Sequence, residues 1–138
     1  MKAKEYLSQA YRLDQRIDAK IEQVMALRNL ATKATSTLSD VAPSGTRNVH
    51  RMEDIIVKLI DLENEINADI DNLVALKHEI MAAIRSIHDP DYCTVLELRY
   101  LCFKPWDQIA VEMGYGIDNV YKLHRMALKT LEARKTGH

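Results

Sequence analysis

The sequence has few of the residues that break helices or form tight turns. Its 138 residues include only four Gly, three Pro and one Phe, which argues against a strand-rich fold with many turns. No uninterrupted apolar run approaches the roughly 18–20 residues that a membrane-spanning helix requires. The first residues also lack the apolar core of a signal peptide. We therefore expect an all-α protein in the cytoplasm, with no membrane partner.

Cysteine is almost as scarce, since Cys93 and Cys102 are the only two in the chain. Their spacing matches neither a zinc-binding pair nor a redox motif, so we expect reduced thiols. His88 and His124 could complete a set of four metal ligands, but nothing in the spacing favours a metal site. The sequence also lacks a Gly-rich phosphate loop, a His-Glu metal motif and a nucleophile elbow. We expect no metal, no cofactor and no enzymatic activity.

Two long amphipathic helices are predicted in the first two thirds of the chain. The first spans residues 3–34 and the second spans about 49–87, with a connector rich in Thr, Ser, Asp, Pro and Gly over 35–48. Apolar residues recur at three- and four-residue steps, as in a coiled coil. In the second helix this stripe consists of Met52, Ile55, Leu59, Leu62, Ile66, Ile70, Leu73, Leu76, Ile80, Ile84 and Ile87.

Opposite charges favour antiparallel pairing of these two helices. Residues 1–34 carry seven basic and four acidic side chains, whereas residues 50–87 carry four basic and eight acidic ones, although each exposed pair contributes little. Two helices rarely enclose a full core, so the hairpin is expected to self-associate as a homodimer. The alternative is an elongated monomeric hairpin packed on the C-terminal domain.

A second domain is expected over residues 89–138, which leaves residues 1–88 as the helical hairpin. Asp89 suits the N-cap and Pro90 the first position of a new helix that runs to about Leu101. A short connector follows, and Pro105 or Trp106 opens the next helix. The sequence therefore predicts three helices in this small domain.

The run from Trp106 to Arg125 carries the pattern of a helix-turn-helix. Ala110 is small where two crossing helices come close, and Gly114 suits the positive φ at a helix end. Apolar residues occupy the positions that would pack the two helices together, namely Ile109, Met113, Tyr115, Val120 and Leu123. Such a motif buries one face and presents the other to a DNA groove.

Basic charge gathers in the same region, because residues 116–138 carry five basic and two acidic side chains. This favours nucleic acid as a partner, whereas the alternative is a solvated helix whose cations suit its C-terminal end. Lys122 and Arg125 could contact phosphate or guanine, and Asn119 could pair with adenine or cap the helix. The candidate DNA-binding residues are Lys104, Ile117, Asp118, Asn119, Tyr121, Lys122, Arg125 and Lys129.

Other candidates have a structural interpretation of equal or greater weight. Tyr121 suits a thymine methyl group, a sugar or a half-buried position, and Asp118 suits the N-terminus of its helix better than a cytosine amino group. Lys104 and Arg99 are candidates for backbone phosphates, with ordinary surface charge as an equal competitor. Trp106 is expected to anchor the domain core.

The signature Leu98-Arg99-Tyr100, Trp106 to Ala110, Met113-Gly114-Tyr115 and Val120 to His124 resembles phage regulators of the ArpU and RinA type. These are similar to region four of sigma factors. The resemblance spans roughly residues 94–131 and implies transcriptional control in a phage or prophage of Gram-positive bacteria, typically activation of late genes. By position it implies that the recognition-helix residues are Ile117, Asp118, Asn119, Tyr121, Lys122 and Arg125.

Two positions depart from the pattern of that family. Gly116 stands where a capping Ser is usual, and Met126 where a basic residue is often found. Because Gly is a tolerated cap, we expect slightly weaker or more adaptable binding.

The leading hypothesis is therefore a sequence-specific DNA-binding transcriptional regulator with double-stranded DNA as its partner. The alternatives are a phage DNA-packaging component similar to a small terminase subunit, or a protein-interaction module acting on host RNA polymerase. Oligomeric state separates the regulator from the packaging component, because a packaging subunit forms a ring of many copies whereas a regulator is a monomer or dimer. The acidic stretch from Glu53 to Asp71, with seven acids and one Lys, could serve protein contacts and would repel DNA.

Overall fold

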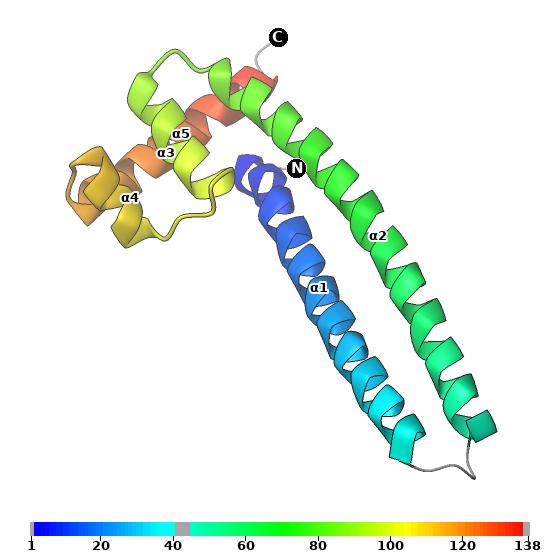
Figure 1. Ribbon diagram of the computed structural model, residues 1–138. Helices are drawn as coiled ribbons and strands as arrows, with labels where there is room; N and C mark the ends of the chain where they lie inside the picture. Colours follow the sequence, from blue (N-terminus) through cyan, green and yellow to red (C-terminus); the bar gives the residue numbers. More distant parts are fainter. Residues whose placement is uncertain (1, 41–44, 137–138) are drawn as a thin grey trace. The chain divides into compact units, whose positions relative to one another are not determined.

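The computed structural model describes residues 2–40 and 45–136 of the chain. In this part every regular element is a helix, which confirms the all-α fold class. The helices are α1 (Ala3–Asp40), α2 (Gly45–Arg85), α3 (Pro90–Tyr100), α4 (Trp106–Met113) and α5 (Ile117–Thr136) (Figure 1). Within the described residues, no helix has the combination of length and apolar character that crossing a membrane demands.

The chain divides into two compact units. Unit 1 contains residues 1–14 and 73–138, and unit 2 contains residues 15–72. The sequence suggests a division at residue 88, whereas unit 1 draws its residues from both sides of that position. The reason is that the first turns of α1 and the last turns of α2 carry apolar residues that belong to the core of unit 1. These residues are Ala3, Leu7 and Ala10 on α1, and Ile80 and Ile84 on α2.

The expected connector over residues 35–48 is wrong in its bounds, because α1 continues to Asp40 and α2 begins at Gly45. Local hydrogen bonds explain how a Thr-containing segment stays helical. The hydroxyl groups of Thr32 and Thr35 donate to the carbonyl oxygens one turn earlier, at 3.1 and 2.9 Å, so they do not compete for other backbone groups. The Pro43-Ser44 pair at the centre of the expected connector lies outside the described residues.

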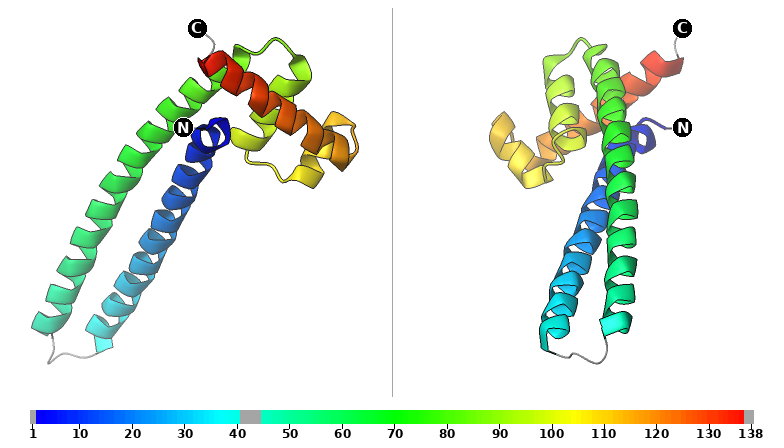
Figure 2. Two further views of the ribbon diagram at one scale, coloured as in Figure 1. Left: turned by 180° about the vertical axis from the view of Figure 1, so that it is seen from behind. Right: turned by 45° about the vertical axis from the view of Figure 1, so that its right-hand side comes forward.

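Unit 2 consists of two helical segments that run side by side in opposite directions (Figures 1 and 2). The ion pairs between them define this direction. Lys20 Nζ lies 2.6 Å from Asp69 Oδ2, and Arg28 Nη2 lies 3.0 Å from Glu63 Oε1. Residue numbers therefore rise along α1 as they fall along α2.

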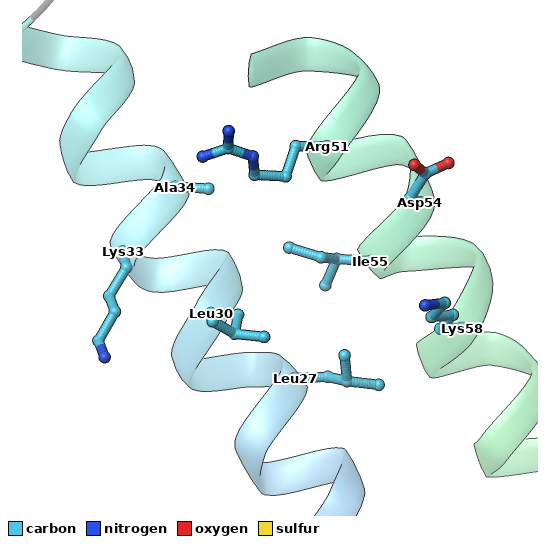
Figure 3. Close-up of a pocket in the computed structure, with 8 residues that line it drawn as sticks. All are labelled: Leu27, Leu30, Lys33, Ala34, Arg51, Asp54, Ile55 and Lys58. Atoms are coloured by element: carbon cyan, nitrogen blue, oxygen red, sulfur yellow. The ribbon is translucent and has the colours of Figure 1, made fainter. Parts of the chain in front are cut away.

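The core of unit 2 is thin. Its buried apolar residues are Ile17, Val24, Ala34 and Ile55. Figure 3 shows Leu27, Leu30 and Ile55 projecting from the two helices toward the space between them, where they line a groove of about 420 Å³. Two helices alone leave much of their apolar surface in contact with water, as their geometry requires.

Unit 1 has a more complete core, in which α3 packs along α5 and α4 packs near the start of α5 (Figure 2). The first turns of α1 and the last turns of α2 also contribute apolar side chains. A hydrogen bond fixes the start of α1, since the Ala3 amide donates to Glu132 Oε1 at 3.1 Å. The buried residues are Ala3, Leu7, Ala10, Ile80, Ile84, Ile87, Val95, Leu96, Tyr100, Ile109, Ala110, Val120, Ala127 and Leu131.

The start of α3 matches the prediction from the sequence. Asp89 is the N-cap, and its Oδ1 accepts hydrogen bonds from the amides of Asp91 and Tyr92 at 2.9 and 3.2 Å. Pro90 occupies the first helical position, where a missing N–H costs nothing. These contacts satisfy amides that would otherwise lack a partner at the helix start.

The loop after α3 contains a non-glycine residue with positive φ, Phe103 at 59°. Its ring packs against Tyr11, with centroids 5.4 Å apart, and Lys77 Nζ lies 4.6 Å from its centre. These contacts from the start of α1 and the end of α2 hold a backbone conformation that a bulky residue rarely adopts. The loop then delivers the chain into α4.

Candidate nucleic-acid interface

The turn between α4 and α5 is set by Gly114, which has φ 73° and ψ 27°. This confirms the left-handed conformation expected there. The amide of Tyr115 donates to the carbonyl of Ala110 at 3.1 Å, and the amide of Gly114 to the carbonyl of Val111 at 3.2 Å. Both bonds satisfy carbonyl groups at the end of α4, so α5 leaves the turn in a defined direction.

Tyr115 fixes the turn through its hydroxyl group as well as its ring. The hydroxyl donates to Asp91 Oδ2 at 2.8 Å, which joins the turn to the first turn of α3. This hydrogen bond raises the pKa of Tyr115. The sequence placed Tyr115 among the apolar packing residues, whereas its side chain is 37% exposed.

Two opposite faces of α5 differ sharply in burial. Val120, His124, Ala127 and Leu131 are buried, and they recur at the three- and four-residue steps of one helix face. The opposite face follows the same spacing and consists of Asp118, Lys122, Arg125 and Lys129, all of them exposed. The helix α5 is therefore packed against the domain on one face and presents three cations and one acid to solvent on the other.

The remaining candidates at the start of α5 flank this exposed face. Ile117 is 41% exposed and Tyr121 is 38% exposed, while Asn119 is exposed about a quarter turn around the helix. The Tyr121 ring also contacts the Trp106 ring edge-on, with centroids 5.6 Å apart. Tyr121 therefore packs against Trp106 while part of its ring stays accessible to solvent.

Two cations that the sequence suggested as phosphate contacts, Lys104 and Arg99, already interact with groups of the protein. Lys104 Nζ forms an ion pair with Glu112 at 2.5 Å. The Arg99 guanidinium donates to the Lys104 carbonyl at 3.0 Å and lies 4.5 Å from the centre of the Trp106 ring. Arg99 thereby holds the loop and the tryptophan, a structural role that its spacing in the sequence does not reveal.

Sequence reasoning missed the polar group that anchors α5. His124 is 8% exposed, and its Nε2 lies 2.7 Å from the Tyr100 hydroxyl. Its ring meets Trp106 edge-on at 4.6 Å. The signal was present, because the residue occupies the apolar stripe of α5 between Val120 and Ala127.

The burial of this pair shifts both of its pKa values. Burial, with the nearby charges of Lys4, Arg99 and Arg125, lowers the pKa of His124 to about 4. Burial also raises the pKa of Tyr100 to about 12. Both groups are therefore neutral near pH 7, and they join α3 to α5 without placing a charge in the core.

The cysteines are free thiols. Cys93 is half-buried, with its Sγ 3.4 and 3.2 Å from the carbonyl oxygens of Ile84 and Ile87, and burial raises its pKa. Cys102 is exposed. Among residues 2–40 and 45–136, no group of three or more His, Cys, Asp or Glu side chains is arranged to hold a metal ion.

These features define an all-helical protein whose last helix presents an exposed, mainly basic face. The chain belongs to the family described as protein of unknown function DUF1492, whose model matches residues 32–132. That stretch includes most of unit 2 and the whole of α3 and α4. No curated protein matches the chain, and no solved structure does.

Proposed function

We propose that this protein is a sequence-specific DNA-binding regulator of transcription, in which α4, the turn at Gly114 and α5 form a helix-turn-helix. One observation carries this proposal: Lys122 and Arg125 are exposed on the side of α5 opposite to its buried face. A helix supported on one side and open on the other suits the major groove, which admits one α-helix.

Each exposed side chain of α5 has a role in this proposal that follows from its chemistry. Arg125 and Lys122 bind phosphates or the acceptor edge of guanine, and Asn119 binds the edge of adenine. Lys129 lies one turn further along the same face and contacts the backbone. Asp118 lies in the first turn of α5, where its carboxylate favours the helix N-terminus.

The helical hairpin formed by α1 and α2 supplies the second part of this proposal. One small domain reads only a few base pairs and binds DNA weakly, so specific binding needs a second copy or a partner on the promoter. The acidic segment of α2 would repel DNA and does not contact it in this scheme. It suits contacts with protein, including RNA polymerase, because the segment from Glu53 to Asp71 has seven acids and one Lys.

The regulated genes follow from the resemblance to ArpU- and RinA-type proteins. On that basis we assign the protein to the control of phage or prophage genes, with activation of late genes as the expected outcome.

The test is DNA binding by a variant that carries both Lys122→Ala and Arg125→Ala. Bound fragments are first selected from the genome of origin, and affinity is then measured across salt concentrations. We expect affinity to fall at least about tenfold. If both cations contact phosphate, the slope of log affinity against log salt becomes less negative by about 1.8.

The matched control removes the same charge elsewhere. Arg12 and Arg16 are exposed cations on α1, and the variant with Arg12→Ala and Arg16→Ala should bind as wild type does. Binding curves of the Lys122 and Arg125 double variant that overlay wild type at every salt concentration would overturn the proposal.

A further inference from the structure

One side of unit 2 is unusually apolar for a surface in contact with water. We call it the isoleucine face, and it consists of Ile21 and Met25 on α1 with Val49, Ile56, Ile60 and Ile70 on α2. Their side chains are between 40% and 60% exposed. On α2 these residues follow one another at steps of seven, four and ten, which keep them on one side of the helix.

The same side carries a groove that joins the two helices. Apolar side chains from both helices line it, together with Asn67 and the ion pair of Arg28 and Glu63. The apolar ones are Ile21, Val24, Met25 and Ile66. The groove has a volume of about 470 Å³. Apolar side chains of another helix can therefore enter between α1 and α2 here, as knobs do in a multi-helix bundle.

The opposite side of unit 2 differs in chemistry. Figure 3 shows Arg51, Asp54 and Lys58 along the α2 edge of its groove, and the neighbouring groove continues this edge with Asp61 and Glu65. Charged residues there keep the surface in water. On the isoleucine face, Glu63 is the charged residue between Ile56 and Ile70, and it is paired with Arg28.

The size of the isoleucine face matches what a stable dimer buries. From Val49 to Ile70 the helix extends about 32 Å, and two helices are about 20 Å wide. Two copies packed on this face would bury about 1,300 Å² in total, which lies within the range of about 1,200–2,000 Å² for specific interfaces.

Charge selects both the partner and its orientation. Residues 15–35 of α1 carry four basic and two acidic side chains, while residues 49–72 of α2 carry two basic and seven acidic ones. Stacking α2 on α2 would bring two acidic helices together. A two-fold axis parallel to the helices instead stacks α1 of each copy on α2 of the other, so that opposite charges flank the apolar contact.

We propose that the isoleucine face binds the same face of a second copy of this chain, forming a four-helix bundle in which α1 of each copy packs on α2 of the other. Every helix then has antiparallel neighbours. The proposal does not depend on DNA binding, because it uses only residues of unit 2.

The first test is sedimentation equilibrium of the full chain at about 10 µM. We expect a dimer for wild type, and at least about tenfold weaker association for Ile60→Arg, since a charge would enter an apolar contact. The matched control is Leu30→Arg on α1, because Leu30 is 50% exposed against 53% for Ile60 but lines the groove on the opposite side of unit 2. This control should remain dimeric.

Three results would overturn the proposal: a monomeric wild type, a ring of many copies, or equal effects of the two Arg variants. Far-ultraviolet circular dichroism confirms that each variant is folded. If the protein is a monomer that still needs Lys122 and Arg125 for DNA binding, the proposed dimer is wrong and the proposed function stands. If it is a dimer that binds no DNA, the proposed function is wrong and the dimer stands.

The orientation has its own measurement. A spin label is attached at His50→Cys, an exposed position next to the isoleucine face, in a chain that also carries Cys93→Ser and Cys102→Ser. The distance between copies is measured by electron paramagnetic resonance. A parallel axis keeps both labels at the same end of the bundle, about 20 Å apart. The reversed arrangement separates them by about 40 Å, and that result would overturn the stacking of α1 on α2.

Discussion

The hydroxyl group of Tyr100 lies 2.7 Å from Nε2 of His124, and both side chains are buried. This bond joins the end of α3 to the middle of α5. Arg125, the next residue, is exposed, so the pair helps to fix the direction in which the basic face of α5 points. A polar pair in an apolar core constrains geometry because an unpaired member would be costly.

The pair makes stability depend on pH. The pKa of His124 is lowered from 6.5 to about 4 in the folded protein, so the unfolded chain takes up a proton more readily. Its contribution to stability is complete above pH 6.5 and is lost as the pH falls toward 4. We expect a loss of about 3 kcal/mol over that range, measured by urea unfolding at pH 7.5 and 4.5.

A double variant isolates this effect from the titration of carboxylates. Tyr100→Phe with His124→Leu replaces both partners by apolar groups and leaves neither unpaired. Its stability should fall less between the two pH values than that of wild type. His78→Gln removes an exposed imidazole and should keep the wild-type dependence. Equal losses in wild type and the double variant would contradict the assignment to His124.

The sequence predicted those parts of the fold that local chemistry determines. Apolar steps of three and four residues indicated the helices, Asp89 indicated the start of α3, and Gly114 indicated the end of α4. The connector was placed too widely because Thr and Ser were interpreted as loop residues. In fact Thr32 and Thr35 bond to their own helix, which composition alone does not reveal.

The candidate site was predictable only in part, for a related reason. Lys122, Arg125 and Asn119 are exposed, and this follows from the periodicity of α5. The partners of Arg99 and Lys104 depend on how the loop after α3 folds. The bond between Tyr100 and His124 joins residues 24 positions apart, so it requires the tertiary arrangement of α3 and α5.

The two glycines around the turn should respond differently to substitution. Gly114 has φ 73°, and a Cβ added there would meet nothing within 4 Å. Gly114→Ala should therefore cost about 1–2 kcal/mol through backbone strain alone. Gly116 has no positive φ and equal space, so Gly116→Ser should be neutral or gain a few tenths of a kcal/mol by capping α5.

Urea unfolding of both variants against wild type measures this difference. Circular dichroism of each folded variant checks that the helices persist. Identical stabilities for Gly114→Ala and Gly116→Ser would show that the left-handed turn is not a constraint on the folded state.

The ion pair between Lys20 and Asp69 allows a test of how the contact between α1 and α2 stabilises unit 2. Their side chains are 14% and 15% exposed, and their charged atoms lie 2.6 Å apart. Lys20 Nζ also lies 3.4 Å from Oε1 of Glu65, whose side chain is 55% exposed and stays hydrated without it. Lys20→Met leaves the mostly buried Asp69 carboxylate without its partner, so the unfolding temperature should fall. Adding Asp69→Leu removes the unpaired charge, and the double variant should equal or exceed wild type. Arg16→Met, at an exposed cation one turn earlier on α1, should change little. A double variant less stable than wild type would mean that the pair contributes more than the apolar contacts that replace it.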